Sequence, residues 1–237
     1  SSAASDVYKR QGRNVVNRQV GDEVIALLAG GGYAEYVSCP EVQTLPLPKN
    51  VNLSDGAAIP EVFATCWLNL FMEGNLKEGE KVLFHAGASG IGTAGIQLCN
   101  IFKCESFITA GNQEKIDFCK NLGSSFGFVR LENSFQSFKD QCPSGFDIIL
   151  DPVGGNYFEE NLNNLAIEGR LIIIGILGGV NGKINIGQLL MKRQKIIGST
   201  IRARSVETKG KVMNDLYKNT WNYFCLLYTS PSPRDWL

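Results

Sequence analysis

The chain has 237 residues, which is enough for one large domain or for one domain and part of a second. Hydrophobic residues make up 44% of the sequence and charged residues 19%, so a packed core is expected and a disordered chain is excluded. Basic and acidic residues number 23 each, and a net charge of zero gives no long-range attraction to nucleic acid or to an anionic membrane. The apolar run 171–180 is about half as long as a membrane span. We therefore expect no nucleic-acid partner and no membrane partner.

Cysteine and histidine restrict the kinds of site that the chain can carry. The seven cysteines are scattered, and no two of them have the C-x-x-C spacing of a zinc ribbon or a thioredoxin-like site. His85 is the single histidine, so a two-histidine metal site or a Ser-His-Asp triad is not expected. We predict no metal. Reduced thiols, together with an opening sequence that does not resemble a secretion signal, predict a cytoplasmic protein.

The two ends of the chain differ from its middle. Residues 1–11 are small and polar without a core pattern, and residues 225–237 contain a run of turn-forming Pro and Ser. We expect both segments to be foreign to the fold or disordered, against the alternative of ordinary flexible termini.

The first part of the chain predicts short strands followed by a helix. Residues 24–28 and 33–37 have strand patterns and are separated by a glycine turn, and Pro46 and Pro48 predict an extended linker. A helix capped by Ser54 or Asp55 should run to about residue 74, with Pro60 in its first turn.

From residue 80 onward, strands alternate with helices. Strands are predicted at 81–86, 106–109, 126–130, 146–150, 170–174 and 195–198, and helices at 91–102, 113–122, 135–141, 157–165, 186–191 and 206–223. Apolar runs in the strands indicate burial on both faces. The pattern predicts an α/β fold with a doubly wound parallel sheet of the Rossmann type.

The sharpest motif follows the first of these strands. Gly90, Gly92 and Gly95 form G-x-G-x-x-G between a strand and a helix, which is the arrangement that binds a dinucleotide. Gly90 would permit the tight turn, Gly92 would let the backbone approach a pyrophosphate, and Gly95 would let the helix pack on the strand. Amides of the first turn, including that of Ile91, would face the phosphates. The alternative is a plain strand-to-helix turn.

The next loop bears on the choice between NAD and NADP. An NAD site usually has an acidic residue about 20 positions after the first glycine, but this segment reads Ala110, Gly111, Asn112. Lys115 and Arg130 could hold a 2′-phosphate instead, so NADP is favoured, although Glu114 opposes it. The alternative is that both basic residues are solvated surface charges.

Two further glycine turns end the fourth and fifth strands of the alternating region. They contain Gly154 and Gly155, and Gly175 and Gly178. Since ligands of such sheets lie over the carboxyl ends of strands, these turns could reach a nicotinamide and its ribose, or they could be ordinary turns. His85 is expected to be a hydrogen-bonded core residue rather than an acid catalyst. The Y-x-x-x-K pair of short-chain dehydrogenases is absent from the sequence.

Several segments, in order and spacing, resemble the zinc-free quinone oxidoreductases of the medium-chain dehydrogenase/reductase superfamily. They are VGDEVIALLAGGGYAEYV, AAIPEVFATCWLNLF, VLFHAGASGIGTAGIQL, TAGNQEK, ILDPVGG and GRLIIIGILGG. The resemblance runs over 12–224 and implies a partial GroES-like β domain at 12–54 and a Rossmann domain at 55–224. It implies NADPH as the coenzyme and a quinone or another α,β-unsaturated carbonyl as the hydride acceptor.

The resemblance also assigns roles to residues. It implies a pyrophosphate loop formed by Gly90, Ile91 and Gly92, a 2′-phosphate loop formed by Gly111, Asn112 and Lys115, and a nicotinamide-ribose loop formed by Leu177 and Gly178. Arg130 and Gly175 are added to the last two sites by the pattern of the strands alone. Thr65 matches a threonine near the nicotinamide pocket and is the one candidate catalytic side chain. Asn112, Glu114 and Arg130 depart from the usual pattern of the 2′-phosphate loop.

Two other functions stay open at this point. An enoyl reductase of the same fold would act on acyl thioesters, and a crystallin-like protein would bind NADPH without catalysis. A methyltransferase that uses S-adenosylmethionine is disfavoured, because the ribose-binding acid is missing. The resemblance further implies a homodimer or homotetramer, with residues 195–201 as the candidate interface. Because family members extend further at both ends, we expect this chain to be poorly stable or inactive by itself.

Overall fold

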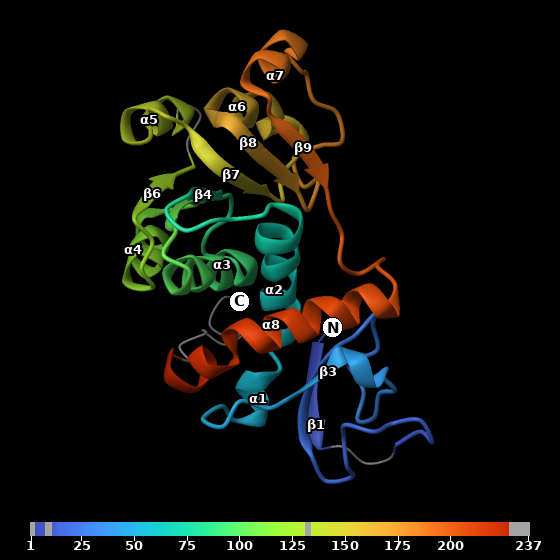
Figure 1. The fold of residues 1–237 in the computed structure, drawn as a ribbon. Coiled ribbons are helices and arrows are strands. Elements are labelled where there is room, and N and C mark those ends of the chain that lie inside the picture. The colour runs from blue at the N-terminus through green and yellow to red at the C-terminus, as the bar shows by residue number, and fades with distance from the viewer. Residues whose placement is uncertain (1–2, 8–10, 131–133, 228–237) are drawn as a thin grey trace. The chain divides into compact units, whose positions relative to one another are not determined.

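The computed structural model describes residues 3–7, 11–130 and 134–227. The chain forms two compact units: the first comprises Ser1–Leu68 and Thr200–Leu237, and the second is Asn69–Ser199. This division differs from the expected boundary between residues 54 and 55, since the helix at 59–66 and the last helix group with the amino-terminal sheet. Figure 1 shows the elements of both units.

The second unit contains a six-stranded parallel sheet with the order β6-β5-β4-β7-β8-β9. Its strands are β4 (Lys81–Phe84), β5 (Glu105–Ala110), β6 (Phe126–Val129), β7 (Phe146–Asp151), β8 (Leu165–Ile173) and β9 (Lys195–Gly198). Its helices are α3 (Gly90–Ile101), α4 (Gln113–Asn121), α5 (Ser134–Gln141), α6 (Gly155–Asn164) and α7 (Ile186–Lys192). The strand order reverses at β4, where the chain crosses from β6 to β7. This confirms the predicted Rossmann arrangement, in which ligands bind at the point of reversal.

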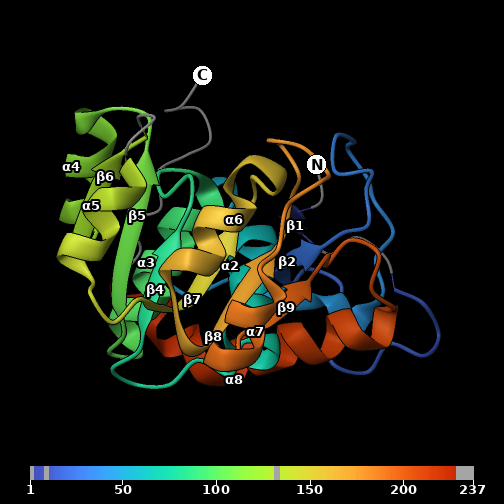
Figure 2. The ribbon, with the colours of Figure 1, turned by 90° about the horizontal axis from the view of Figure 1, so that it is seen from above.

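Helices cover both faces of this sheet. Figures 1 and 2 show α3 and α4 on one face and α5 and α6 on the other. Burial on both faces explains why β4 and β7 are apolar at successive positions rather than at alternate ones. One cluster of the core joins aromatic and aliphatic side chains from strands and helices: Leu83, Phe107, Phe128, Phe138, Phe146, Ile149, Leu162 and Leu171.

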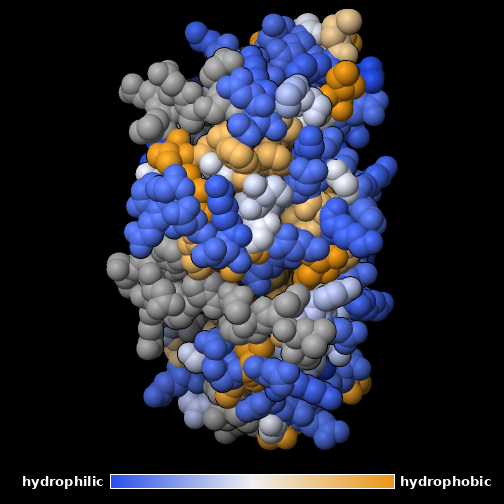
Figure 3. Space-filling model, turned by 90° about the vertical axis from the view of Figure 1, so that its left-hand side faces the viewer, coloured by the Kyte–Doolittle hydropathy of each residue, from blue (hydrophilic) through white to orange (hydrophobic). Residues whose placement is uncertain are grey.

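The outer side of α4 is polar. Residues 113–115 and Asp117 are exposed, whereas Ile116 and Cys119 face the sheet and are buried. Figure 3 shows the side of the molecule on which α4 lies in Figure 1, and its described surface is mainly hydrophilic. The alternation of exposed and buried positions along α4 is that of a helix with one face on a sheet.

The first unit contains a three-stranded antiparallel sheet with the order β1-β2-β3. Its strands are β1 (Ala3–Val7), β2 (Glu23–Leu27) and β3 (Thr44–Pro46), and a short 3-10 helix, η1 (Glu41–Gln43), precedes β3. Its helices are α1 (Leu53–Gly56), α2 (Ile59–Cys66) and α8 (Val206–Leu227). Helix α2 continues into a π-helical segment, η2 (Trp67–Glu73), which contains the boundary between the units.

Three expectations for the first unit were wrong. Residues 3–7 of the expected tail form β1, which pairs with β2 from Ala3↔Leu27 to Val7↔Glu23, because main-chain pairing does not require a side-chain pattern. Residues 33–37 form no strand: both edges of β2 are already paired, and Tyr33 is 93% exposed.

The cap of the first helix also differs from the prediction. The Asn52 side chain, not Ser54 or Asp55, accepts the capping hydrogen bond, and the Asp55 amide donates it at 2.8 Å. Pro60 lies in the first turn of α2, as predicted. Residues 225–227 continue α8, whereas 228–237 of the second expected tail lie outside the described residues.

Candidate functional site

The candidate site is the side of the six-stranded sheet at which its strands end, which we call the carboxyl edge. Three turns and one helix start meet there: the glycine turn 85–90 after β4, the start of α4 at 111–115 after β5, the turn 152–155 after β7 and the turn 174–179 after β8. Main-chain bonds hold the glycine turn to its neighbours, since the His85 amide donates to the Leu150 carbonyl at 3.2 Å and the Gly87 amide to the Thr109 carbonyl at 2.8 Å.

The glycine turn is packed closely against the helix that follows it. A Cβ atom on Gly92 would lie 2.2 Å from the Gly87 oxygen, so this glycine lets the first turn of α3 approach the chain's own backbone. That is a different reason from the predicted approach of a pyrophosphate. A Cβ atom on Gly95 would lie 2.2 Å from the Phe84 ring, which confirms that Gly95 lets the helix pack on the strand.

The start of α3 suits an anion. Ser89 caps the helix, with its Oγ accepting from the Gly92 amide at 3.2 Å, and Ser89 and Gly90 are exposed. No acidic side chain lies in the first turn. The positive end of the helix dipole is therefore open to solvent and unopposed by a carboxylate there.

The start of α4 gathers three of the four residues predicted to hold a 2′-phosphate. Asn112 caps α4 through its Oδ1 atom, which accepts from the Lys115 amide at 3.0 Å, so its side chain supports the helix. Gly111, Asn112 and Lys115 are all exposed, and no atom lies within 4 Å of where a Cβ on Gly111 would be. A group could therefore lie against Gly111 without displacing the chain. Glu114, in the same first turn, is the opposing charge.

Arg130 makes a contact that sequence reasoning missed. It follows β6, its amide donates to the Ala110 carbonyl at 2.8 Å, and its charged guanidinium lies close enough to the Tyr157 hydroxyl in α6 to act on the pKa of that group. Burial raises the pKa of Tyr157, and the neighbouring Arg130 opposes that shift. The sequence contained no signal for this pairing, because α6 is separated from Arg130 by α5 and β7.

The two later turns are bonded to each other. The Gly178 amide donates to the Val153 carbonyl at 2.7 Å, and the Leu177 amide to the Pro152 carbonyl at 3.2 Å. A Cβ atom on Gly175 would lie 2.6 Å from the Pro152 oxygen, so this glycine permits the close approach of the two turns. Leu177 is 86% exposed at the tip of its turn and is available to a ligand.

His85 lies in the core, as predicted. It is 3% exposed, its Nδ1 atom lies 3.1 Å from the Thr109 hydroxyl, and its Nε2 atom lies 2.7 Å from Oδ1 of Asn161. Burial lowers the pKa of His85 to about 4, against the opposing effect of the hydrogen bond that Oδ1 of Asn161 accepts. A neutral imidazole with both nitrogens engaged is not an acid catalyst at neutral pH.

Asp151 extends this buried group and was not among the predicted site residues. It is fully buried and accepts three hydrogen bonds, from the amides of Val153 (2.6 Å) and Gly154 (3.1 Å) and from Nδ2 of Asn161 (2.9 Å). Burial raises the pKa of Asp151, and the three donors oppose that effect. An acid directly before Pro-Val-Gly-Gly at a strand end was the sequence signal that could have identified it.

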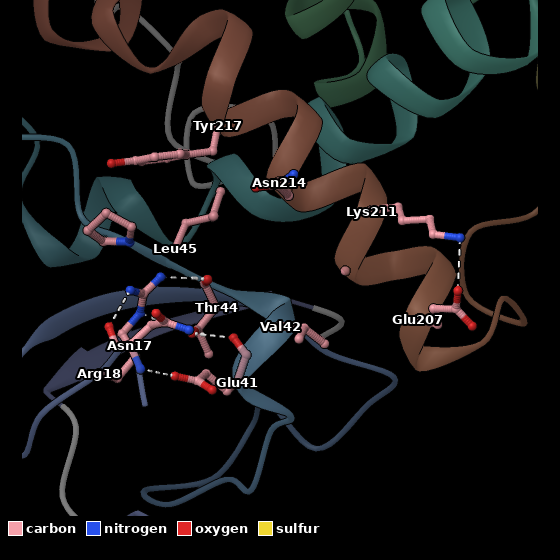
Figure 4. A pocket seen from close by; sticks show the side chains of 12 residues that line it. Asn17, Arg18, Glu41, Val42, Thr44, Leu45, Glu207, Lys211, Asn214 and Tyr217 are labelled. Atoms are coloured by element: carbon pink, nitrogen blue, oxygen red, sulfur yellow. Dashed lines mark hydrogen bonds and ion pairs between the residues drawn. The ribbon is translucent and has the colours of Figure 1, made fainter. Parts of the chain in front are cut away.

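The first unit holds the remaining candidate, Thr65, and a separate cavity. Thr65 is 6% exposed in α2, and its part in catalysis remains a prediction. The cavity, of about 590 Å³, lies between the η1–β3 segment and α8 (Figure 4). Its charged side chains are engaged within the cavity wall: Arg18 donates to the Thr44 hydroxyl and carbonyl, and Lys211 pairs with Glu207 at 2.8 Å. We therefore assign no ligand to it.

Neither a metal cluster nor a membrane helix is found in the part of the chain that the structure describes. Over 3–7, 11–130 and 134–227, no three His, Cys, Asp or Glu side chains are grouped so that they could hold a metal ion. Over the same ranges, no helix has the length and apolar character needed to cross a bilayer.

Comparison with known protein families gives a match in the region that contains most of the carboxyl edge. The family model described as zinc-binding dehydrogenase matches residues 90–216, which is more than half of the chain. The chain belongs to the zinc-binding dehydrogenase family. This match confirms the resemblance to medium-chain dehydrogenases/reductases, and it covers α3, the sheet from β5 to β9 and part of α8.

Individual known proteins resemble the chain at moderate identity. Mouse prostaglandin reductase-3 is 29% identical over 202 residues, which is 82% of this chain and 51% of that protein. The solved CurK enoyl reductase is 26% identical with a TM-score of 0.81, covering 96% of this chain and 69% of that one. The quinone oxidoreductase of Thermus thermophilus, also solved with NADPH, is 28% identical with a TM-score of 0.74, covering 88% and 65%. The chain thus spans about half the length of the curated relative.

Proposed function

We propose that this zinc-binding dehydrogenase family member binds NADPH at the carboxyl edge and takes part in hydride transfer to a quinone or another α,β-unsaturated carbonyl. The observation that carries the proposal is the packing of the glycine turn. Gly92 and Gly95 bring α3 against Gly87 and Phe84, so the open helix start lies where the strand order reverses. The Thermus quinone oxidoreductase, whose structure includes NADPH, supports the choice of coenzyme.

The residues of the carboxyl edge fit the coenzyme in three places. The turn formed by Gly90, Ile91 and Gly92 would receive the pyrophosphate at the positive end of α3. Lys115 beside the open space at Gly111 would receive the 2′-phosphate, with Asn112 fixing the start of α4. A charge-assisted hydrogen bond is worth about 1.5–3 kcal/mol, which is enough for a clear preference for NADPH over NADH.

Arg130 has a modified part in this proposal. Because its guanidinium lies beside the Tyr157 hydroxyl, it contributes positive charge at the end of β6, next to α6. The turn that contains Gly175, Leu177 and Gly178 would lie against the nicotinamide ribose, with the exposed Leu177 covering it.

The chemistry asks little of protein side chains. When bound, the coenzyme supplies the hydride, and the protein binds it, orients it and excludes water. His85 is neutral and buried, so it neither gives nor takes the proton that accompanies reduction. We propose that this proton comes from solvent or from a hydroxyl, and that the Thr65 hydroxyl orients the acceptor.

The proposal is tested by calorimetric titration of the chain with NADPH and NADH. We expect heat of binding with NADPH and weaker binding of NADH, and we expect Lys115→Ala to weaken NADPH by about tenfold while leaving NADH unchanged. Lys120→Ala, on the same exposed helix at its last turn, is the matched control and should alter neither. No heat with either coenzyme would contradict the proposal.

An enoyl reductase is the second candidate, supported by the likeness to the CurK enoyl reductase. Stopped-flow loss of NADPH absorbance with a quinone, compared with an enoyl thioester, separates the two acceptors. NADPH binding without turnover of either acceptor would favour a non-catalytic, coenzyme-binding role. We further propose a cytoplasmic protein that assembles through β9, because this strand is paired on one side only and its Ile196 is 37% exposed.

A further inference from the structure

A continuous chain of buried hydrogen bonds runs along the carboxyl edge, beneath the turns. It links Thr109 at the end of β5, His85 after β4, Asn161 in α6 and Asp151 at the end of β7. Thr109 is 3% exposed, Asn161 1% and Asp151 0%. Four neighbouring buried polar groups of this kind are costly unless each is satisfied, so their arrangement calls for a physical reason.

The Asp151 end determines which group donates and which accepts in each of these hydrogen bonds. The three hydrogen-bond partners of the Asp151 carboxyl group are N–H donors, and between them they reach both of its oxygens, so both oxygens accept. The Asn161 amide must therefore turn its NH₂ group toward Asp151, which leaves its carbonyl oxygen facing His85.

The same order of donor and acceptor continues at the imidazole of His85. A carbonyl oxygen can only accept, so Nε2 of His85 carries the hydrogen that it donates to Asn161. Because burial keeps His85 neutral, with a pKa of about 4, its Nδ1 atom is bare and accepts the hydrogen of the Thr109 hydroxyl. The Thr109 oxygen in turn accepts from the Ala86 amide at 3.3 Å. Each donor thus points the same way, from Ala86 to Asp151.

Both ends of the chain are main-chain amides of the coenzyme-facing turns. One end is the Ala86 amide in the glycine turn, and the other is the pair of amides at Val153 and Gly154 in the turn after β7. The latter turn is bonded to the turn that contains Gly178. This chain of hydrogen bonds therefore adds a side-chain link between the glycine turn and the turn after β7, and through that turn to the one that contains Gly178.

We infer that Asn161 and His85 are positioning residues that hold these three turns in register for a dinucleotide. The inference rests on the proposed function, since the coenzyme is the ligand that would span the turns. Neither residue needs to contact it. The Tyr157 ring packs edge-on against the imidazole of His85, with 4.8 Å between the ring centroids, and covers it.

The experiment uses the fact that His85 is the single histidine in the sequence. Nitrogen-15 NMR of the whole chain without coenzyme reports its tautomer directly. We expect hydrogen on Nε2, none on Nδ1, and no titration near the ordinary pKa of 6.5. Hydrogen on Nδ1, or titration near 6.5, would overturn the ordered chain.

Variants then test the positioning. Asn161→Leu and His85→Leu each interrupt the chain of hydrogen bonds. We expect each substitution to weaken NADPH binding by about tenfold or more, and to speed amide hydrogen exchange in 85–90, 152–155 and 174–179. His85→Gln keeps a donor toward Asn161 and an acceptor toward Thr109, and it should restore most of the affinity. Unchanged NADPH affinity in folded Asn161→Leu would overturn the inference.

Ser124→Ala is the matched control. The Ser124 hydroxyl is buried and bonds the Ser106 and Phe126 carbonyls, but it lies where β5 and β6 begin, away from the carboxyl edge. It should lower stability without changing NADPH affinity or exchange in the three turns, and an equal loss of affinity would overturn the inference. If wild type binds no NADPH, the proposed function fails, whereas exchange in the coenzyme-free variants still decides whether the chain of bonds holds the turns.

Discussion

The two edges of the six-stranded sheet use buried polar groups for different ends. Directly before β4, Glu80 forms a bidentate ion pair with Arg170 of β8, whose Nη1 and Nη2 atoms lie 2.9 Å and 2.7 Å from the two carboxylate oxygens. Nε of Arg170 also donates to the Gly74 carbonyl at 2.8 Å. These bonds join groups on this side of the sheet to one another. At the carboxyl edge, the chain from Thr109 to Asp151 ends on amides of turns whose outer surface is open. A buried polar group can therefore serve stability alone, or it can also hold the turns of a binding site, depending on the part of the molecule to which its hydrogen bonds lead.

The largest expected effect is at the glycine turn. Gly92→Ala places a Cβ atom 2.2 Å from the Gly87 oxygen, so we expect a loss of about 1–3 kcal/mol in the free energy of unfolding and no measurable NADPH binding. Denaturant unfolding and calorimetry measure the two effects. Gly198→Ala, where nothing lies within 4 Å, is the control and should change neither. A Gly92→Ala chain as stable as wild type would show that the packing of α3 is not tight.

The second expected effect is a dependence of stability on pH, caused by His85 at the carboxyl edge. His85 has an ordinary pKa of 6.5 in the unfolded chain and about 4 in the folded chain. Below pH 6.5 the unfolded state therefore binds a proton at His85 that the folded state does not bind. The contribution of His85 to the free energy of unfolding is complete above pH 6.5 and falls by about 3 kcal/mol as the pH drops toward 4.

This pH effect is read as a difference between wild type and His85→Gln, measured by denaturant unfolding at each pH. The raised pKa of Asp151 gives the opposite slope, but that carboxyl is common to both proteins. The difference in unfolding free energy should shrink as pH falls from 6.5. A difference that stays constant over this range would mean that the folded state accepts the proton on His85.

A smaller effect is expected at the opposite edge. Arg170→Met removes the pair with Glu80, whose pKa is lowered by the bond from Arg170 against the effect of burial. We expect a loss of about 1–2 kcal/mol in the free energy of unfolding, because Glu80 keeps only the hydrogen bond from the Lys77 amide, and unchanged NADPH affinity. Loss of NADPH binding in a folded Arg170→Met chain would remove the distinction between the two edges.

The sequence was informative where side chains alone determine the structure. Apolar runs such as 146–150 and the spacing of Gly90, Gly92 and Gly95 predicted β7, α3 and the doubly wound sheet, because burial on both faces leaves a local pattern. The first unit was harder to predict. β1 depends on main-chain pairing with β2, and 33–37 failed to form a strand because β2 has no free edge. Neither fact is visible in a local pattern.

The candidate site was predicted in part for the same reason. Gly92 was singled out correctly as a position that excludes a side chain, but its neighbour proved to be Gly87, seen only after folding. His85 was assigned to the core, whereas its partners Thr109 and Asn161 lie 24 and 76 residues away along the chain. Contacts over such separations depend on the strand order, which one sequence does not reveal.

The most direct test of the central claim is an NMR titration of the chain with NADPH, followed through its backbone amides. The account predicts shift changes that saturate and that concentrate in residues 85–92, 111–115, 152–155 and 174–179, with little change near Arg170 or Ser124. Shift changes centred on another part of the chain, or none at all, would contradict the assignment of the carboxyl edge as a coenzyme site.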